Sequence, residues 1–153
     1  EEDMLGEFVF GTDGKGAENL IVKELTARNS YILQNNERPT LYMNGPEIFN
    51  FTIETIPPLL QKVIAKNKLQ VTDIDYFILH QANKYILEFL ISEMCLDKNK
   101  CHIDMLNYGN TVSNTIPIAL KDSLKQGRIK ERDKVLLAGF GVGYSWGSTI
   151  ITL

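Results

Sequence analysis

The chain has 153 residues, of which 44% are hydrophobic, and this suffices for one compact domain with an apolar core. Sixteen Lys and Arg against nineteen Asp and Glu leave a net charge of −3, without the basic block that neutralises many phosphates, so nucleic acid is not an expected partner. The longest apolar stretch, residues 135–144, is far too short to span a membrane and no signal segment opens the sequence, so we expect a cytoplasmic globular protein.

The first part of the chain predicts one strand and one long helical segment. Residues 5–10 read as a strand that enters the turn GTDGKG, in which the Asp-Gly pair favours left-handed backbone angles. Residues 46–69 carry mostly apolar side chains at helical spacing: Ile48, Phe51, Thr52, Ile56, Leu59, Leu60, Val63 and Ile64. Pro57 and Pro58 remove two amide donors, so we expect a kink there or two consecutive helices.

The second part alternates strands and helices. We expect a buried strand at 74–79, a helix at 83–95, a strand at about 101–106 and a helix at about 114–126. Pro117 suits the first turn of that last helix, and Gly127 suits its C-terminal cap. Residues 133–140 and 145–153 form two strands joined by glycines. The order predicts an α/β fold: a mixed five-stranded sheet, mostly parallel with an antiparallel terminal strand, and helices on its faces.

Three polar or glycine-rich turns fall just beyond predicted strands. They are HQAN at 80–83, NYGNT at 107–111 and GFGVG at 139–143. In an open α/β sheet, ligands bind in the crevice outside the carboxyl ends of parallel strands. We therefore expect a binding or catalytic site where these turns meet.

Each turn also has a structural interpretation. A lone histidine at a strand end is more often a hydrogen-bonded structural residue than a catalyst, and NYGNT could be an Asn/Gly turn before a helix. The glycine-rich turn lacks the G-x-G-x-x-G pattern and precedes a strand, which argues against a dinucleotide or Walker phosphate site. Its glycines would let backbone N–H groups approach a ligand or turn the chain sharply.

Taken together, the turns resemble the C-terminal half of the β-ketoacyl-acyl carrier protein synthase III family, which has the thiolase-like fold. GTDGKGAENL is similar to the turn after that family's mid-chain strand, and LYMNGPEIFNFTI to its M-x-G-x-E-x-F segment. HQAN, YGNT followed by IPIAL, and GFGVGYSWG are similar to its catalytic-histidine motif, its catalytic-asparagine motif and its terminal hairpin. The resemblance covers nearly the whole chain and implies that residues 1–153 are one thiolase-like half, the C-terminal domain.

The resemblance implies that His80 and Asn110 are catalytic and bind the thioester carbonyl of a malonyl donor. When malonyl thioester loses carbon dioxide, negative charge develops on that oxygen, and a neutral imidazole N–H and an amide NH2 can stabilise the enolate. The enolate then attacks an acyl group held on a cysteine. The implied activity is an acyltransferase reaction of fatty acid biosynthesis, the decarboxylative Claisen condensation of an acyl-coenzyme A starter with malonyl-acyl carrier protein.

Other site residues are implied in the same way. Phe140 matches an aromatic residue beside the reacting thioesters, and Val142 stands where the family usually supplies an oxyanion-hole N–H from glycine. Lys84 lies about one helical position from the basic residue with which many members meet the acidic carrier protein. Four residues match positions that line the tunnel for the pantetheine arm of coenzyme A or carrier protein, although Phe49 could equally be a core residue: Gly45, Phe49, Ala82 and Asn83.

Neither cysteine suits the role of nucleophile. Cys95 lies late in a largely apolar predicted helix, where we expect it to be packed and its thiol pKa to be raised. Cys101 begins a predicted strand beside His102, but adjacent strand residues point to opposite faces. Because the family carries its nucleophile in the N-terminal half, we expect that half to be absent from this sequence and the fragment alone to be inactive.

The remaining expectations concern substrates and partners. We expect coenzyme A and acyl carrier protein thioesters as substrates, no permanently bound cofactor, and no metal, since two cysteines and two histidines make a poor zinc site. The expected partners are the N-terminal half of the same enzyme and acyl carrier protein, with the full-length protein a homodimer. An isolated half should expose an apolar surface, which we place on the 115–124 helix at Ile116, Ile118, Ala119 and Leu120.

Two alternatives stay open at this point. The chain could be a non-catalytic module that binds coenzyme A or acyl thioesters. It could also be another thiolase-like condensing enzyme, of the hydroxymethylglutaryl-coenzyme A synthase or thiolase type, which would use a second Cys or a Glu in place of the His/Asn pair.

Overall fold

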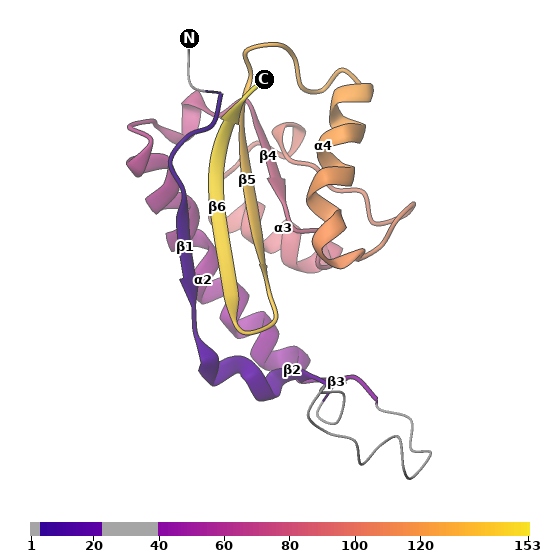
Figure 1. Ribbon diagram of the computed structural model, residues 1–153. Helices are drawn as coiled ribbons and strands as arrows, with labels where there is room; N and C mark the ends of the chain where they lie inside the picture. The colour runs from indigo at the N-terminus through magenta and orange to yellow at the C-terminus, as the bar shows by residue number, and fades with distance from the viewer. Residues whose placement is uncertain (1–3, 23–39) are drawn as a thin grey trace.

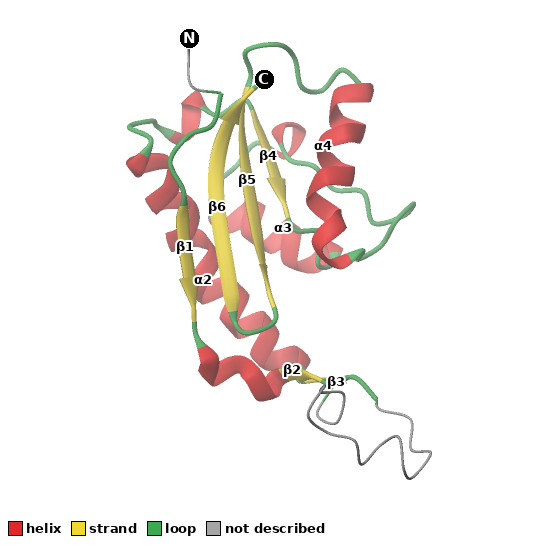
Figure 2. Cartoon of the chain, viewed as in Figure 1, coloured by secondary structure: helices red, strands yellow, loops and turns green. Residues whose placement is uncertain are grey.

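The computed structural model describes residues 4–22 and 40–153, which form a four-stranded sheet with helices on both faces and a separate two-stranded sheet (Figure 1). Figure 2 shows the helices flanking the sheet. The main elements are β1 (Val9–Thr12), β2 (Leu20–Ile21), β3 (Tyr42–Met43), α2 (Gly45–Lys66), β4 (Tyr76–Leu79), α3 (Lys84–Glu93), α4 (Thr115–Lys125), β5 (Lys134–Gly141) and β6 (Ser145–Thr152). Short 3-10 helices cover Gly14–Asn19, Val71–Asp73, Lys98–Lys100 and Val112–Asn114.

The four-stranded sheet has the order β1-β6-β5-β4. Strands β4 and β5 pair in parallel, whereas β6 is antiparallel to both of its neighbours, β5 and β1. Consequently β1, β5 and β4 run in one direction and the terminal strand β6 opposes them, as the arrows of Figure 1 show. The expected mixed α/β sheet with an antiparallel terminal strand is confirmed.

The expected fifth strand at 101–106 does not form. Its place at the edge beside β4 is taken by one residue, since Cys101 makes a single parallel bridge with Phe77. The chain then turns away, because the Asp104 carboxylate accepts hydrogen bonds from the backbone and side-chain nitrogens of Asn107 at 2.9–3.3 Å. Such local side-chain bonds compete with a strand ladder. The first strand is also shifted: β1 spans Val9–Thr12, and Leu5 makes only an isolated bridge with Ile151.

Helix α2 runs without a break through Pro57 and Pro58, so the expected division into two helices is wrong. Asn44 caps its first turn by accepting a hydrogen bond from the Glu47 N–H. Prolines inside a helix cost about 3 kcal/mol or more, but apolar residues on both sides of this pair are fully buried against the same sheet. That packing decides the outcome, since most helical stability in proteins comes from burying one face: Phe51, Ile56, Leu59, Leu60, Val63 and Ile64.

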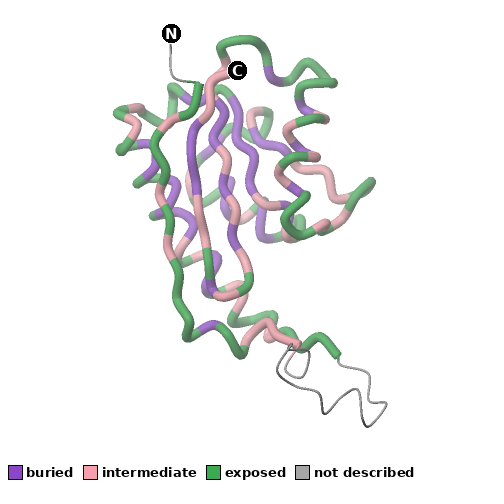
Figure 3. The backbone as a smooth tube through the Cα atoms, in the orientation of Figure 1, coloured by how far each residue is buried: buried purple, intermediate pink, exposed green. Residues whose placement is uncertain are grey.

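The sheet separates two apolar cores because successive strand residues face opposite sides. Phe77 and Leu79 of β4 belong to the larger core, which α2 and α3 cover. Tyr76 and Ile78 belong to the smaller core beneath α4. On its face of the sheet, helix α4 covers only β4 and β5. The tube in Figure 3 shows largely buried central strands, whereas β1 alternates between intermediate and exposed residues.

None of the helices in the described part of the chain is long and apolar enough to cross a membrane.

Candidate active site

A groove of about 850 Å³ opens on the sheet face that α4 leaves uncovered. Glycines of β5 and β6 line it, where larger side chains would fill the space: Gly139, Gly141 and Gly147. Phe10 of β1, Phe8 just before that strand and residues of the loop before α4 also line it. His80, Asn110, Phe140 and Val142 all contribute to this one groove. The structure therefore brings together the four candidate residues that three separate turns supply.

His80 lies directly after β4, and its backbone N–H donates to the Ala138 carbonyl at 2.8 Å, which continues the pairing with β5. Its imidazole meets the Phe140 ring edge to face, with ring centroids 5.4 Å apart and planes at 85°. Its Nδ1 lies 2.7 Å from the Thr115 hydroxyl oxygen. Burial lowers the pKa of His80 below its ordinary value of 6.5, so the ring is neutral near pH 7.

Asn110 follows Gly109, whose φ of +62° gives the left-handed turn that glycine adopts without steric cost. The Asn110 Oδ1 accepts a hydrogen bond from the Val112 N–H at 2.8 Å. This bond determines the orientation of the amide, because Oδ1 must face Val112 and the NH2 group must point away from it. A neutral donor is thus held at the groove.

The turn between β5 and β6 carries Val142, which is 54% exposed. The Ser145 hydroxyl donates to the Val142 carbonyl at 2.8 Å. Tyr144 anchors the turn, because its ring stacks on Phe51 with centroids 4.0 Å apart and its backbone exchanges two hydrogen bonds with Asp13. The glycine-rich segment is therefore the anchored rim of the groove.

The four candidate pantetheine residues lie elsewhere, around the N-terminal ends of α2 and α3. Phe49 is partly buried against the larger core and contacts Tyr85 and Phe89, each with ring centroids 5.6 Å apart. Asn83 caps α3 by accepting a hydrogen bond from Ile86, and Ala82 packs against the same core. A Cβ on Gly45 would meet no atom within 4 Å, so packing among the described residues does not require glycine there. None of the four lines the groove.

The two cysteines differ in burial. Cys101 is buried, and burial together with the charge of Asp97 raises the pKa of its thiol to about 12. Cys95 is exposed just beyond α3, so our expectation of a packed side chain is wrong. Neither cysteine lines the groove, and the described residues contain no cluster of three or more His, Cys, Asp or Glu that could hold a metal ion.

The sequence reasoning missed two buried residues: Gln81, which lies behind the groove, and Thr115, which lines it. Gln81 is 3% exposed, and its side chain joins the end of β4 to the next segment. Its Nε2 donates to the Leu79 and His102 carbonyls at 2.8 and 3.1 Å, and its Oε1 accepts from the Asp104 N–H at 3.1 Å. Thr115, at the start of α4, holds His80. The HQAN motif contained a signal for Gln81, whereas nothing in the sequence pointed to Thr115.

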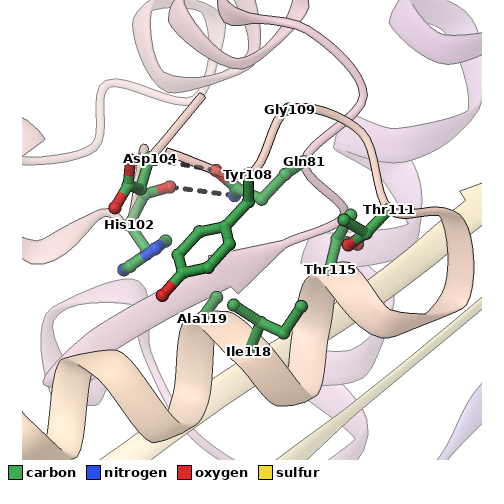
Figure 4. A pocket seen from close by; sticks show the side chains of 9 residues that line it. All are labelled: Gln81, His102, Asp104, Tyr108, Gly109, Thr111, Thr115, Ile118 and Ala119. Carbon is green, nitrogen blue, oxygen red and sulfur yellow. Dashed lines mark hydrogen bonds between the residues drawn. The ribbon is translucent and has the colours of Figure 1, made fainter. Parts of the chain in front are cut away.

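A small cavity about the size of one water molecule lies between Gln81 and α4, and Thr115 of α4 lines it (Figure 4). The picture shows Gln81 and His102 on one side and Thr111 beside Thr115 on the other. His102 is buried, and its Nδ1 lies 2.9 Å from the Ser123 hydroxyl. The cavity wall thus consists of the same side chains that tie the Asn110 loop to β4 and α4.

The exposed apolar surface does not lie where we expected it. Ile116, Ala119 and Leu120 of α4 pack against the smaller core, because the apolar side of this helix faces β4 and β5. The large exposed apolar side chains that line the groove come instead from β1, β3 and the surrounding loops: Phe8, Phe10, Leu41, Met43, Val112 and Val142. Ile116 in the first turn of α4 also lines the groove, so the helix contributes one expected residue to a surface that is mainly the sheet face.

Comparisons with known proteins agree on one family. A family model described as "3-Oxoacyl-[acyl-carrier-protein (ACP)] synthase III C terminal" matches residues 64–153. A beta-ketoacyl-[acyl-carrier-protein] synthase III of Clostridium tetani is 37% identical over 150 residues, which cover 92% of this chain and 45% of that protein. The corresponding protein of Clostridium acetobutylicum is 34% identical over 152 residues, which cover 99% of this chain and 47% of that protein.

A crystal structure of a 3-oxoacyl-(acyl-carrier-protein) synthase III matches all of this chain and 49% of its own, with a TM-score of 0.93 and 36% sequence identity. The chain therefore spans about half the length of the relatives that it matches.

Proposed function

Because this chain belongs to the 3-oxoacyl-[acyl-carrier-protein] synthase III family, we propose that it is the enolate-stabilising, C-terminal half of a condensing enzyme. The reaction is the decarboxylative Claisen condensation of an acyl-coenzyme A starter with malonyl-acyl carrier protein, in fatty acid biosynthesis. His80 and Asn110 bind the malonyl thioester carbonyl. Phe140 and the Val142 N–H border the reacting thioesters.

The observation that carries the proposal is the meeting of two neutral hydrogen-bond donors in one groove. His80 is neutral near pH 7 because burial lowers its pKa, and the Asn110 amide is oriented by its bond to Val112. As carbon dioxide leaves, charge moves onto the thioester oxygen, and donors that are already oriented stabilise it without reorganising. A carboxylate in either place would repel the same charge.

The acyl-accepting thiol comes, in this proposal, from residues outside this sequence. The chain has only two cysteines, and neither lines the groove. Cys101, with a pKa raised to about 12, carries almost no thiolate near pH 7. The N-terminal half of the same enzyme packs over the uncovered apolar face and places its cysteine above His80 and Asn110.

Family membership also supports the choice of substrates and partners. Coenzyme A and acyl carrier protein present their thioesters on a pantetheine arm, which enters past the N-terminal ends of α2 and α3 at Gly45, Phe49, Ala82 and Asn83. The open space beside Gly45 suits the close approach of such an arm. The complete enzyme acts as a homodimer.

The experiment uses the full-length protein that the gene encodes. His80→Ala and Asn110→Ala are compared for release of carbon dioxide from malonyl-acyl carrier protein and, separately, for transfer of an acyl group from acyl-coenzyme A to the enzyme. Carbon dioxide release should fall by about 10²-fold or more, the usual scale for losing an oxyanion donor, while acyl transfer falls less.

Asn114→Ala is the matched control, because Asn114 is an exposed amide of the same loop whose side chain makes no capping hydrogen bond and does not line the groove. Undiminished carbon dioxide release in both site variants would refute the proposal. Thioester binding without any turnover in the wild-type protein would instead favour a non-catalytic binding module.

A further inference from the structure

The hydroxyl of Thr115 has two neighbours that compete for its proton. Its Oγ1 lies 2.7 Å from His80 Nδ1 and 3.0 Å from the Val112 carbonyl oxygen. A hydroxyl group carries a single proton, and a carbonyl oxygen can only accept. The direction of the Thr115 hydroxyl therefore decides which nitrogen of a neutral His80 is protonated.

The two arrangements have opposite consequences at the groove. If Thr115 donates to Val112, His80 must donate from Nδ1, and its Nε2 is then a bare acceptor. If Thr115 donates to Nδ1, the proton of His80 lies on Nε2. Only the second form gives His80 a donor at Nε2, because a neutral imidazole has one N–H.

The distances favour the second arrangement. Bonds donated by a hydroxyl to oxygen are commonest at about 2.7–2.8 Å, whereas bonds donated by an N–H to oxygen are commonest at about 2.9–3.0 Å. The contact between Thr115 and Nδ1 matches the hydroxyl value, and the contact with Val112 is longer. Thr115 is also 2% exposed at the start of α4, so water cannot easily replace it as the partner of Nδ1.

We propose that Thr115 is a positioning residue whose hydroxyl donates to Nδ1 and holds His80 as the Nε2–H tautomer. Resting on the proposed function, this assigns Thr115 the task of making His80 a donor toward the enolate oxygen. The Nδ1–H tautomer would present a lone pair to the same oxygen and would repel it. Thr115 also borders the groove, but in this proposal it acts through His80, because its hydroxyl is bound to Nδ1.

A second contact between a histidine and a hydroxyl of α4 provides an internal control. Its second histidine, His102, has Nδ1 2.9 Å from the hydroxyl of Ser123, another buried residue of α4. His102 does not line the groove. Ser123→Ala therefore removes an equivalent hydroxyl from the same helix and the same kind of contact, and it should leave His80 unaffected.

The test is a nitrogen NMR measurement of the imidazole tautomers in full-length protein labelled with 15N-histidine, with His80→Gln used to assign the signals. Wild-type His80 should be protonated at Nε2 and hydrogen-bonded at Nδ1. Thr115→Val should remove the hydrogen-bond shift at Nδ1 and populate the Nδ1–H form, and Thr115→Ser should restore the wild-type pattern. Ser123→Ala should change only the His102 signals.

Kinetics give the second readout. Thr115→Val should lower carbon dioxide release by about tenfold, less than the loss of the donor itself, and should spare acyl transfer. Thr115→Ser should recover most of the rate.

Two results would overturn the inference: a wild-type His80 protonated at Nδ1, or Thr115→Val signals of His80 identical to the wild type. The first needs no variant, so it stands even if Thr115→Val folds poorly. If the tautomer responds as described but His80→Ala keeps full decarboxylation, the tautomer assignment holds and the proposed function fails.

Discussion

The buried amide of Gln81 donates to the carbonyl of His102 at 3.1 Å and so links the end of β4 to the segment that leads to Asn110. All three of its hydrogen bonds go to backbone atoms. The two catalytic candidates, one beside Gln81 and one beyond His102, are therefore held in register by a side chain that does not line the groove.

Gln81→Ala should destabilise the protein by about 2 kcal/mol or more, because it leaves buried carbonyl and N–H groups without partners. The free energy of unfolding in urea measures this loss. Gln61→Ala, on the exposed side of α2, is the control and should stay within about 0.5 kcal/mol of the wild type. Equal stability of the two variants would show that the Gln81 bonds do not hold the loops.

The pH dependence of stability should reflect the buried His102 and the partly buried His80. Burial lowers the pKa of both His80 and His102 below 6.5; at His102, Arg128 acts in the same direction and Asp104 and Asp122 oppose it. The unfolded chain then binds more protons than the folded chain below about pH 6.5, so stability is complete above that pH and is lost as the pH falls toward the folded values.

Urea unfolding of the wild type and His102→Gln, measured from about pH 8 to about pH 5, checks this sign. The slope of unfolding free energy against pH should be smaller in the variant, whatever its absolute stability. A wild-type protein that gains stability on acidification through this range would contradict the assignment.

The cysteines should differ in reactivity. In the folded 153-residue chain, a maleimide should label exposed Cys95 readily and buried Cys101 only after unfolding. Incubation with acyl-coenzyme A should give no acyl adduct, which intact-mass spectrometry detects directly. A stoichiometric adduct on either cysteine would place the nucleophile within this sequence and would contradict the proposed division of the enzyme.

The uncovered sheet face should make the 153-residue chain associate. Phe10 is 72% exposed and stacks on Phe8 with ring centroids 5.4 Å apart, at one side of the groove. Phe10→Lys should reduce self-association, measured by sedimentation velocity, because it places a charge in a contiguous apolar surface. Tyr85→Lys, equally exposed but outside the groove, is the control; a similar effect of both changes would indicate nonspecific charge repulsion.

The order and spacing of the turns sufficed to predict that His80 and Phe140 lie in one groove. His80 follows β4 and Phe140 lies near the end of β5, and the carboxyl ends of these two parallel strands share one edge, so their meeting was predictable. Asn110 lines the same groove although the strand predicted before it does not form, so its place could not be derived in this way. The limits of α4 were predictable too, because Pro117 fits a first turn and Gly127 has the positive φ of a C-terminal cap. These features depend on local backbone chemistry, which the residue types themselves carry.

Tertiary structure decided the rest, because the competing local effects nearly balance. Two prolines predicted a kink in α2 or two consecutive helices, and one helix forms because burial of a continuous face against the sheet outweighs their missing donors. Residues 101–106 had a strand-like pattern, but only Cys101 pairs with β4. The hydrogen bond between the Asn107 and Asp104 side chains then turns the chain away from the sheet. The partner of His80 depends on where α4 begins relative to β4, and that distance is set only when both elements pack on the same core.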